Sequence, residues 1–129
     1  MDIKTHLLAD MTLLGFPVEV NEGKSAKVQL PIIENMIIDD YGLVHGGFTF
    51  GLADYAAMLA VNDPNVVIGS ANVKFIAPVQ RGDIMTAKAE IIEENKSKRV
   101  VHVEVSVEDT VVLNGELTCF ILHQHILSA

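Results

Sequence analysis

The hydrophobic residues follow two different spacings along the chain, which separate predicted helices from predicted strands. Near the N-terminus they recur at the three- and four-residue intervals of one helical stripe. This stripe consists of Ile3, Leu7, Leu8, Met11 and Leu14. We therefore predict a first helix that Asp2 caps and that Gly15 and Pro17 end.

Alternating hydrophobic and polar residues predict strands, which span residues 16–22, 26–32, 66–76, 84–93, 98–108 and 111–123. Short turns join the last four, so we expect those strands to pair antiparallel. Asn114 and Gly115 form either a hairpin turn or a bulge. We favour a bulge in one long strand, because residues 111–113 are short for a strand of their own.

A second predicted helix opens at His45-Gly46-Gly47, after an irregular loop over residues 34–44, and ends near Asn62. Hydrophobic residues lie nearly all round this helix, which is typical of a helix buried on most sides. In a chain of 129 residues the sheet must curl around it to bury it. We predict an α+β fold of one domain, residues 1–129, with an antiparallel sheet curled around the central apolar helix and the N-terminal helix at one edge.

Asp54 is the one charged residue within residues 48–61. Burying an unpaired carboxylate costs several kcal/mol or raises its pKa. Asp54 is therefore either a core aspartate satisfied by hydrogen bonds or a solvated edge, or a carboxylate held in an apolar cleft as a base or nucleophile.

The glycine pair at the start of the same helix has two interpretations. The first amides of a helix lack helical partners, and the helix dipole there favours negative charge. Gly46 and Gly47 also let a ligand approach the backbone closely. The arrangement fits a bound carbonyl that becomes an oxyanion, and it fits a simple turn ordered by His45 equally well.

Composition and charge exclude several classes of function. The net charge of −8 repels phosphate backbones, so we expect no nucleic-acid partner. Residues 48–61 form the longest apolar stretch, which is shorter than the roughly 20 residues that span a bilayer. With no secretion signal at the N-terminus, we expect a cytoplasmic protein without a membrane partner.

Cys119 is predicted to be a small buried hydrophobe. No third ligand lies near His123 and His125, so we expect no metal site.

Two segments resemble the PaaI-like thioesterases, the HGG branch of the hotdog-fold superfamily. Residues 42–54 resemble the family signature, in which an acidic residue lies nine positions after the histidine of the HGG motif, as Asp54 follows His45. Residues 72–83 are similar to the family's strand and its F-x-x-P-x-x-x-G-D turn. The order of predicted elements matches over nearly the whole chain, so the resemblance implies the hotdog fold.

The resemblance also implies a reaction, the hydrolysis of an acyl-CoA to a free acid and CoA. No metal or redox cofactor is implied, since CoA is part of the substrate. The Gly47 amide would polarise the thioester carbonyl, Asp54 would act as general base or nucleophile, and His45 would position the loop or the thioester. The expected substrate-binding residues are Gly46, Asp39, Asn72 and Phe75.

Asp39 departs from the family pattern and keeps a second function open. Many relatives carry an asparagine six residues before the HGG histidine. An asparagine amide donates to a thioester or a water, whereas an ionised aspartate only accepts. The alternative is therefore a catalytically weak hotdog protein that binds acyl-CoA for regulation. A hydratase or dehydratase on the same fold is a further alternative, for which we find no motif.

Helix geometry indicates that two chains share each site. Gly47 and Asp54 are seven residues apart, which separates their backbones by roughly 10 Å along a helix axis. A short aspartate side chain hardly reaches a carbonyl bound at its own Gly47 amide. Two antiparallel helices across a two-fold axis would bring Asp54 of one chain to Gly47 of the other. We expect a homodimer, or a homotetramer built from such dimers, with acyl-CoA as the small-molecule partner.

Overall fold

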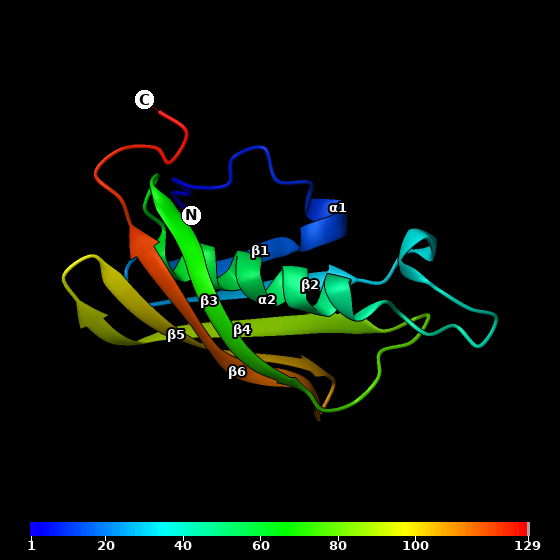
Figure 1. Ribbon diagram of the computed structural model, residues 1–129. Coiled ribbons are helices and arrows are strands. Elements are labelled where there is room, and N and C mark those ends of the chain that lie inside the picture. The colour runs from blue at the N-terminus through cyan, green and yellow to red at the C-terminus, as the bar shows by residue number, and fades with distance from the viewer. Residues whose placement is uncertain (129) are drawn as a thin grey trace.

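The computed structural model describes residues 1–128, so the last residue of the predicted domain lies outside it. Its elements follow one another in the predicted order (Figure 1). They are α1 (Met11–Leu14), β1 (Phe16–Asn21), β2 (Ser25–Pro31), the 3₁₀ turn η1 (Glu34–Met36), α2 (Gly46–Val61), β3 (Val66–Phe75), β4 (Ile84–Asn95), β5 (Lys98–Val107) and β6 (Thr110–Ile121).

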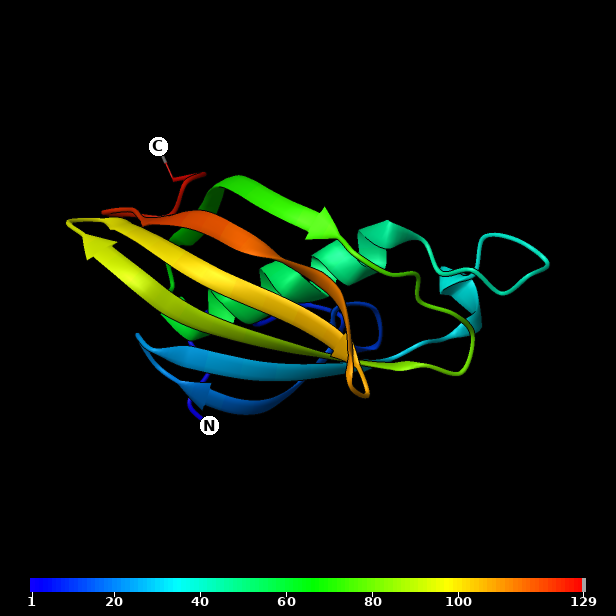
Figure 2. The ribbon, with the colours of Figure 1, turned by 90° about the horizontal axis from the view of Figure 1, so that it is seen from below.

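All six strands form one antiparallel sheet in the order β1-β2-β4-β5-β6-β3, as the fold prediction requires. The sheet curls around α2, which lies along its concave side (Figures 1 and 2). Consecutive strands β4, β5 and β6 are joined as hairpins, whereas β3 crosses over to pair with β6. The two edge strands of the sheet are therefore β1 and β3. Strand β3 follows α2 directly in the chain.

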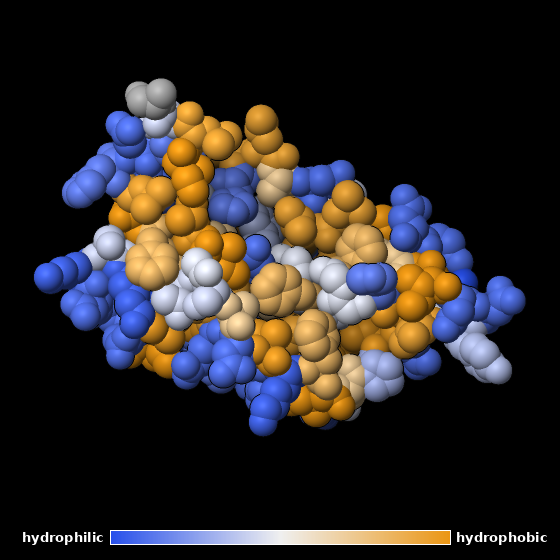
Figure 3. Space-filling model, in the orientation of Figure 1, coloured by the Kyte–Doolittle hydropathy of each residue, from blue (hydrophilic) through white to orange (hydrophobic). Residues whose placement is uncertain are grey.

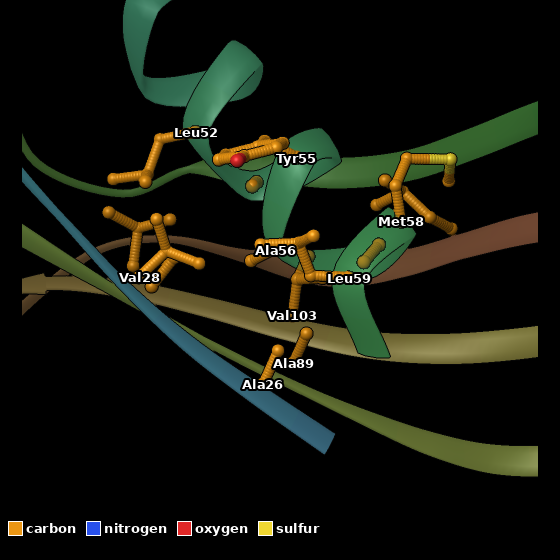
Figure 4. Close-up of a cluster of buried hydrophobic side chains, with 14 of the residues drawn as sticks. Ala26, Val28, Leu52, Tyr55, Ala56, Met58, Leu59, Ala89 and Val103 are labelled. Atoms are coloured by element: carbon orange, nitrogen blue, oxygen red, sulfur yellow. The ribbon is translucent and has the colours of Figure 1, made fainter. Parts of the chain in front are cut away.

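The core lies between α2 and the inner face of the sheet, and the predicted burial of this helix is confirmed. Small side chains on both surfaces allow close packing, because Ala56 of α2 faces the strands that carry Ala89 and Ala26 (Figure 4). Larger side chains such as Leu59 and Val103 fill the remaining space and are completely buried. No helix within residues 1–128 is long and apolar enough to cross a membrane.

The N-terminal helix is present but far shorter than predicted, since α1 begins at Met11 and Asp10 rather than Asp2 caps it. Residues 2–9 run instead as an irregular segment that buried Asn62 fastens to the end of α2. The Lys4 amide donates to Asn62 Oδ1 at 2.8 Å, and Asn62 Nδ2 donates to the Asp2 carbonyl at 2.8 Å. Leu7 and Leu8, which made the helical stripe convincing, are 72% and 99% exposed.

The last strand is continuous, as predicted, but its irregularity lies at residue 112 rather than at Asn114 and Gly115. Opposite β5, Leu113 pairs with Val105 and Val111 with Ser106, which leaves Val112 as the extra residue. Gly115 has a different role. A Cβ there would collide with the Asn72 carbonyl of β3 and lie 2.6 Å from Val73 Cα, so the glycine permits close approach of the two strands.

Candidate active site

The glycine turn at the start of α2 is exposed and capped by its own histidine. His45 is the N-cap residue, and its Nδ1 accepts a hydrogen bond of 2.8 Å from the Gly47 amide. A Cβ on Gly47 would lie 2.8 Å from the same nitrogen, so the glycine makes room for the ring. The turn is anchored where the His45 amide donates to the Met36 carbonyl at 3.0 Å.

This cap bears directly on the predicted oxyanion site. The Gly47 N–H is already engaged by the imidazole, so a substrate carbonyl oxygen has to replace Nδ1 as the acceptor. The His45 side chain is exposed, but its ring packs edge-on against Phe48, with the ring centroids 6.3 Å apart. Rotation of the imidazole away from Gly47 therefore gives up this contact as well as the hydrogen bond. The turn therefore holds one amide whose internal partner a ligand would have to displace.

Asp54 lies two turns further along α2, and its side chain is partly buried. Its Oδ1 is buried and has no hydrogen-bond partner among residues 1–128. Burial raises the pKa of the Asp54 carboxyl above its ordinary value. Within residues 1–128, neither the backbone nor Tyr55 satisfies the buried Oδ1, so that form of the core alternative is not found. The other form, a carboxylate at a solvated edge, fits the partly exposed Asp54 side chain.

Cys119 of β6 lies close enough to Asp54 for the negative charge of the carboxylate to affect the thiol. The pKa of its thiol is raised to about 12, first by burial and then by the negative charge of Asp54. The thiol is fully buried and stays protonated near neutral pH, so the prediction of a small buried hydrophobe is confirmed. Asp54 therefore lies near an un-ionised thiol, and among residues 1–128 it forms no salt bridge that would compensate its charge.

A pocket of about 410 Å³ adjoins the glycine turn and brings two predicted residues together. Gly46 and Phe75 both line it, and a Cβ on Gly46 would lie 3.4 Å from the Phe75 ring. Sequence reasoning missed the other walls, which come from Val44, Thr49 and residues 76–79. The F-x-x-P turn was the available signal, because its middle residues follow Phe75 directly.

The structure does not bring Asn72 to this pocket. Asn72 pairs with Glu116, which in turn pairs with His102, and these three side chains line a shallow depression on the outer face of the sheet. Val103, the neighbour of His102, points to the core instead. Asn72 and the glycine turn are thus on opposite sides of the sheet within one chain.

Asp39 builds the loop that precedes the glycine turn. Its Oδ1 accepts hydrogen bonds from the amides of Tyr41 at 3.0 Å and Leu43 at 3.2 Å. Both bonds use the side chain as an acceptor, a role that aspartate and asparagine perform equally. In the single chain, therefore, Asp39 is bonded to its own loop rather than to Asp54 or to the pocket.

A family model described as the thioesterase superfamily matches residues 41–114. Among curated relatives, the methylthioribose-1-phosphate isomerase of Aquifex aeolicus is 50% identical over 95% of this chain, but that match covers 27% of the isomerase. The transcription factor FapR of Caldanaerobacter subterraneus is 29% identical over 97% of this chain and 62% of FapR. The chain thus spans about a quarter of the length of the isomerase and about three fifths of the length of FapR.

Two solved structures show the same fold. The uncharacterized protein PH1136 from Pyrococcus horikoshii is 51% identical, with a TM-score of 0.96 over 99% of this chain and 98% of that one. A mutant of the phenylacetic acid degradation protein PaaI from Thermus thermophilus is 29% identical, with a TM-score of 0.77 over 87% and 97% of the two chains. These similarities confirm the predicted hotdog fold and the resemblance to PaaI-like thioesterases.

Proposed function

Because this chain belongs to the thioesterase superfamily, we propose that it hydrolyses an acyl-CoA to a free acid and CoA, with Asp54 as the catalytic carboxylate. The state of Asp54 carries this proposal. Its unpartnered, buried oxygen is destabilised in the free protein, and a raised pKa makes a carboxylate a stronger base. An unsatisfied buried group calls for an explanation, and a catalytic role is one of the recognised ones.

In this reaction the Asp54 carboxylate takes a proton from a water molecule, whose oxygen adds to the thioester carbonyl carbon. The carbonyl oxygen becomes an oxyanion, which the Gly47 amide and the positive end of α2 stabilise once the oxygen has displaced His45 Nδ1. Collapse of the tetrahedral intermediate breaks the C–S bond, and the proton passes from Asp54 to the leaving sulfur. Direct attack by the carboxylate, followed by hydrolysis of the anhydride, uses the same groups.

The site becomes complete in a homodimer. Within one chain the backbones of Gly47 and Asp54 are roughly 10 Å apart along α2. Strand β3 is an edge of the sheet, and unpaired edges are templates for pairing with another chain. Hydrophobic side chains gather on the same face of the molecule, over the N-terminal segment and around β3 (Figure 3). Antiparallel pairing of two β3 strands would extend the sheet and turn the two α2 helices toward each other in opposite directions.

Regulation by acyl-CoA binding is the second candidate, and two observations favour it. A relative with 29% identity over almost the whole chain is named a transcription factor. The Gly47 amide is also occupied by His45 in the free chain, which would slow a hydrolase but would not prevent binding. In this alternative the same cleft holds the thioester without turning it over.

The two candidates are separated by thiol release from a panel of short, long and aromatic acyl-CoAs, measured with a thiol reagent. We expect hydrolysis of at least one member by the wild type and loss of most of the rate in Asp54→Asn. Asp109→Asn, which changes an exposed aspartate in the β5–β6 turn, is the matched control and should keep the wild-type rate. Tight binding without thiol release across the panel would replace hydrolysis by the regulatory function.

A further inference from the structure

The N-terminal segment contains a turn with two leucines at its tip. The Ala9 amide donates to the His6 carbonyl at 3.0 Å, so Leu7 and Leu8 are the central residues of this leucine turn. Their exposed fractions are 72% and 99%. The tips of turns usually carry glycine, proline, asparagine, aspartate or serine. Adjacent exposed leucines at such a position indicate a surface that another molecule covers.

Contacts before and after the leucine turn hold it in one place. Before it, Thr5 is buried, and its Oγ1 lies within hydrogen-bond distance of His6 Nδ1, at 2.8 Å. His6 itself has a φ of 55°, a left-handed conformation that residues other than glycine rarely adopt. After it, the Asp10 side chain caps α1 by accepting a hydrogen bond of 2.9 Å from the Thr12 amide. The fold therefore presents the two leucines to solvent from a fixed position.

The neighbours of the leucine turn place it beside the candidate carboxylate. On one side of the turn, the His6 ring lies 6.1 Å from the Tyr55 ring of α2. On the other side, Leu14 packs on α2 at Gly51, where a Cβ would lie 3.2 Å from the Leu14 Cδ2. The turn between these two contacts thus runs alongside the part of α2 that contains the partly exposed Asp54.

Strand β3 leaves a second apolar surface uncovered. Ile68 and Phe75 pair with Cys119 and Leu113 of β6, whose side chains are completely buried. Directly paired residues share one face of a sheet, so Ile68 and Phe75 lie on its helix side. They are nevertheless 37% and 58% exposed, because α2 of the same chain does not cover them. Figure 3 shows hydrophobic side chains around β3 and over the N-terminal segment on one face of the molecule.

We propose that the leucine turn docks on a second copy of this chain, against the apolar surface around that copy's β3, and shields the Asp54 of its own chain from bulk solvent. The inference rests on the homodimer of the proposed function. Both apolar surfaces lie on one face of every chain, so a two-fold axis lets each chain give one turn and receive one. The net charge of −8, with Asp2 and Asp10 on either side of the turn, disfavours an anionic lipid surface as the occupant.

A single tryptophan tests the docking directly. The chain contains no tryptophan, so the fluorescence of Leu8→Trp reports on the leucine turn alone. We expect blue-shifted emission and protection from iodide in the dimer, both lost on dilution below its dissociation constant. Ile92→Trp replaces a 50%-exposed residue of β4, an inner strand, and as the matched control should not respond to dilution.

The other outcomes of this experiment also decide the matter. Loss of the dimer in Leu8→Trp but not in Ile92→Trp places the leucine turn at the contact, because the larger side chain then blocks association. Emission of Leu8→Trp that stays solvent-like in a demonstrated dimer would overturn the proposal. A chain that sediments as a monomer at every concentration would overturn it too.

Serine substitutions measure the contribution of the two leucines. The double variant Leu7→Ser with Leu8→Ser should raise the dissociation constant of the dimer at least about tenfold for each leucine that the contact buries, measured by sedimentation. Ile92→Ser should leave it unchanged. In the remaining dimers of the double variant, water reaches Asp54, which favours the ionised carboxylate. The acid limb of the pH–rate profile should therefore move to lower pH, and an unmoved limb would refute the shielding of Asp54.

The outcomes separate this inference from the proposed function, since association is measured without substrate. A leucine turn that is buried in the dimer, without thiol release from any acyl-CoA, contradicts hydrolysis and leaves the docking intact. Thiol release combined with an unchanged dissociation constant of the double variant supports hydrolysis and removes the docking.

Discussion

Replacing Asp54 by asparagine should slow catalysis and stabilise the fold at the same time. Asparagine has nearly the same shape but is neither a base nor an anion, and general base catalysis alone contributes about 10²–10⁴-fold to a rate. The same change removes a buried charge whose Oδ1 has no partner in the described chain. Asparagine leaves a polar atom at the same place, so only the cost of the charge is removed, and the variant should be more stable than the wild type at neutral pH.

The gain in stability must depend on pH in a defined direction. Burial raises the pKa of Asp54 in the folded protein above the ordinary value of 3.8 that holds in the unfolded chain. Between these two values the folded state binds more protons, so its free energy of unfolding falls as the pH rises. The wild type therefore loses this stability as the pH rises through the folded-state pKa, whereas Asp54→Asn does not. Below about pH 3.8 the two proteins should melt alike.

Both expectations for Asp54→Asn can be checked on the same preparations from pH 3.5 to 8. Thermal melting measures the gain in stability, and thiol release measures the loss of rate. A domain of this size gains about 4 °C in melting temperature per kcal/mol. A variant that melts normally and turns over at nearly the wild-type rate would remove Asp54 from the mechanism. A variant that melts lower than the wild type at pH 7 would mean that the carboxylate has a stabilising partner, and the argument from its burial would fail.

Three further predictions concern other residues. Gly115→Ala should destabilise the protein by about 1–3 kcal/mol in denaturant titrations, because its Cβ collides with the β3 backbone; an unchanged midpoint would show that the strands separate freely. Cys119, with a thiol pKa of about 12, should not react with a thiol reagent at pH 8 until the protein is unfolded, and rapid native labelling would contradict its burial. Asp39→Asn should change stability by no more than about 0.5 kcal/mol, since an amide oxygen can accept the same two bonds, whereas a large loss would require the second carboxylate oxygen or the charge.

Periodicity was sufficient to predict the strands and the central helix, because both depend on which positions face the core. It failed at the N-terminus, where the spacing of Leu7 and Leu8 favours a helix but hydrogen bonds to Asn62 hold the segment in another conformation. Those bonds join residues about 60 positions apart, and local spacing carries no information about them. The tertiary contact therefore decided the conformation of this segment against its local preference.

For the candidate site, the sequence indicated which residues to consider better than it indicated their hydrogen bonds and the face of the sheet on which they lie. A strand alternates its side chains, so the three-residue separation of Asn72 and Phe75 already indicates opposite faces of the sheet. The sequence left a turn ordered by His45 as one of two interpretations, and the hydrogen bond from the Gly47 amide to its Nδ1 fits that interpretation. The partner atom itself could not be predicted, because it depends on the rotamer of the imidazole over the turn. The burial of Asp54, by contrast, followed directly from the apolar residues around it in the sequence.

Complementation between two inactive variants tests the shared active site most directly. Gly47→Val places a branched side chain at the proposed carbonyl site, and Asp54→Asn removes the proposed catalytic carboxylate. After the two chains are unfolded and refolded together, half of the dimers are mixed and each has one intact site, so about a quarter of the wild-type rate should return. Absence of activity, with subunit exchange and native folds demonstrated, would mean that both groups act from the same chain and would contradict the account.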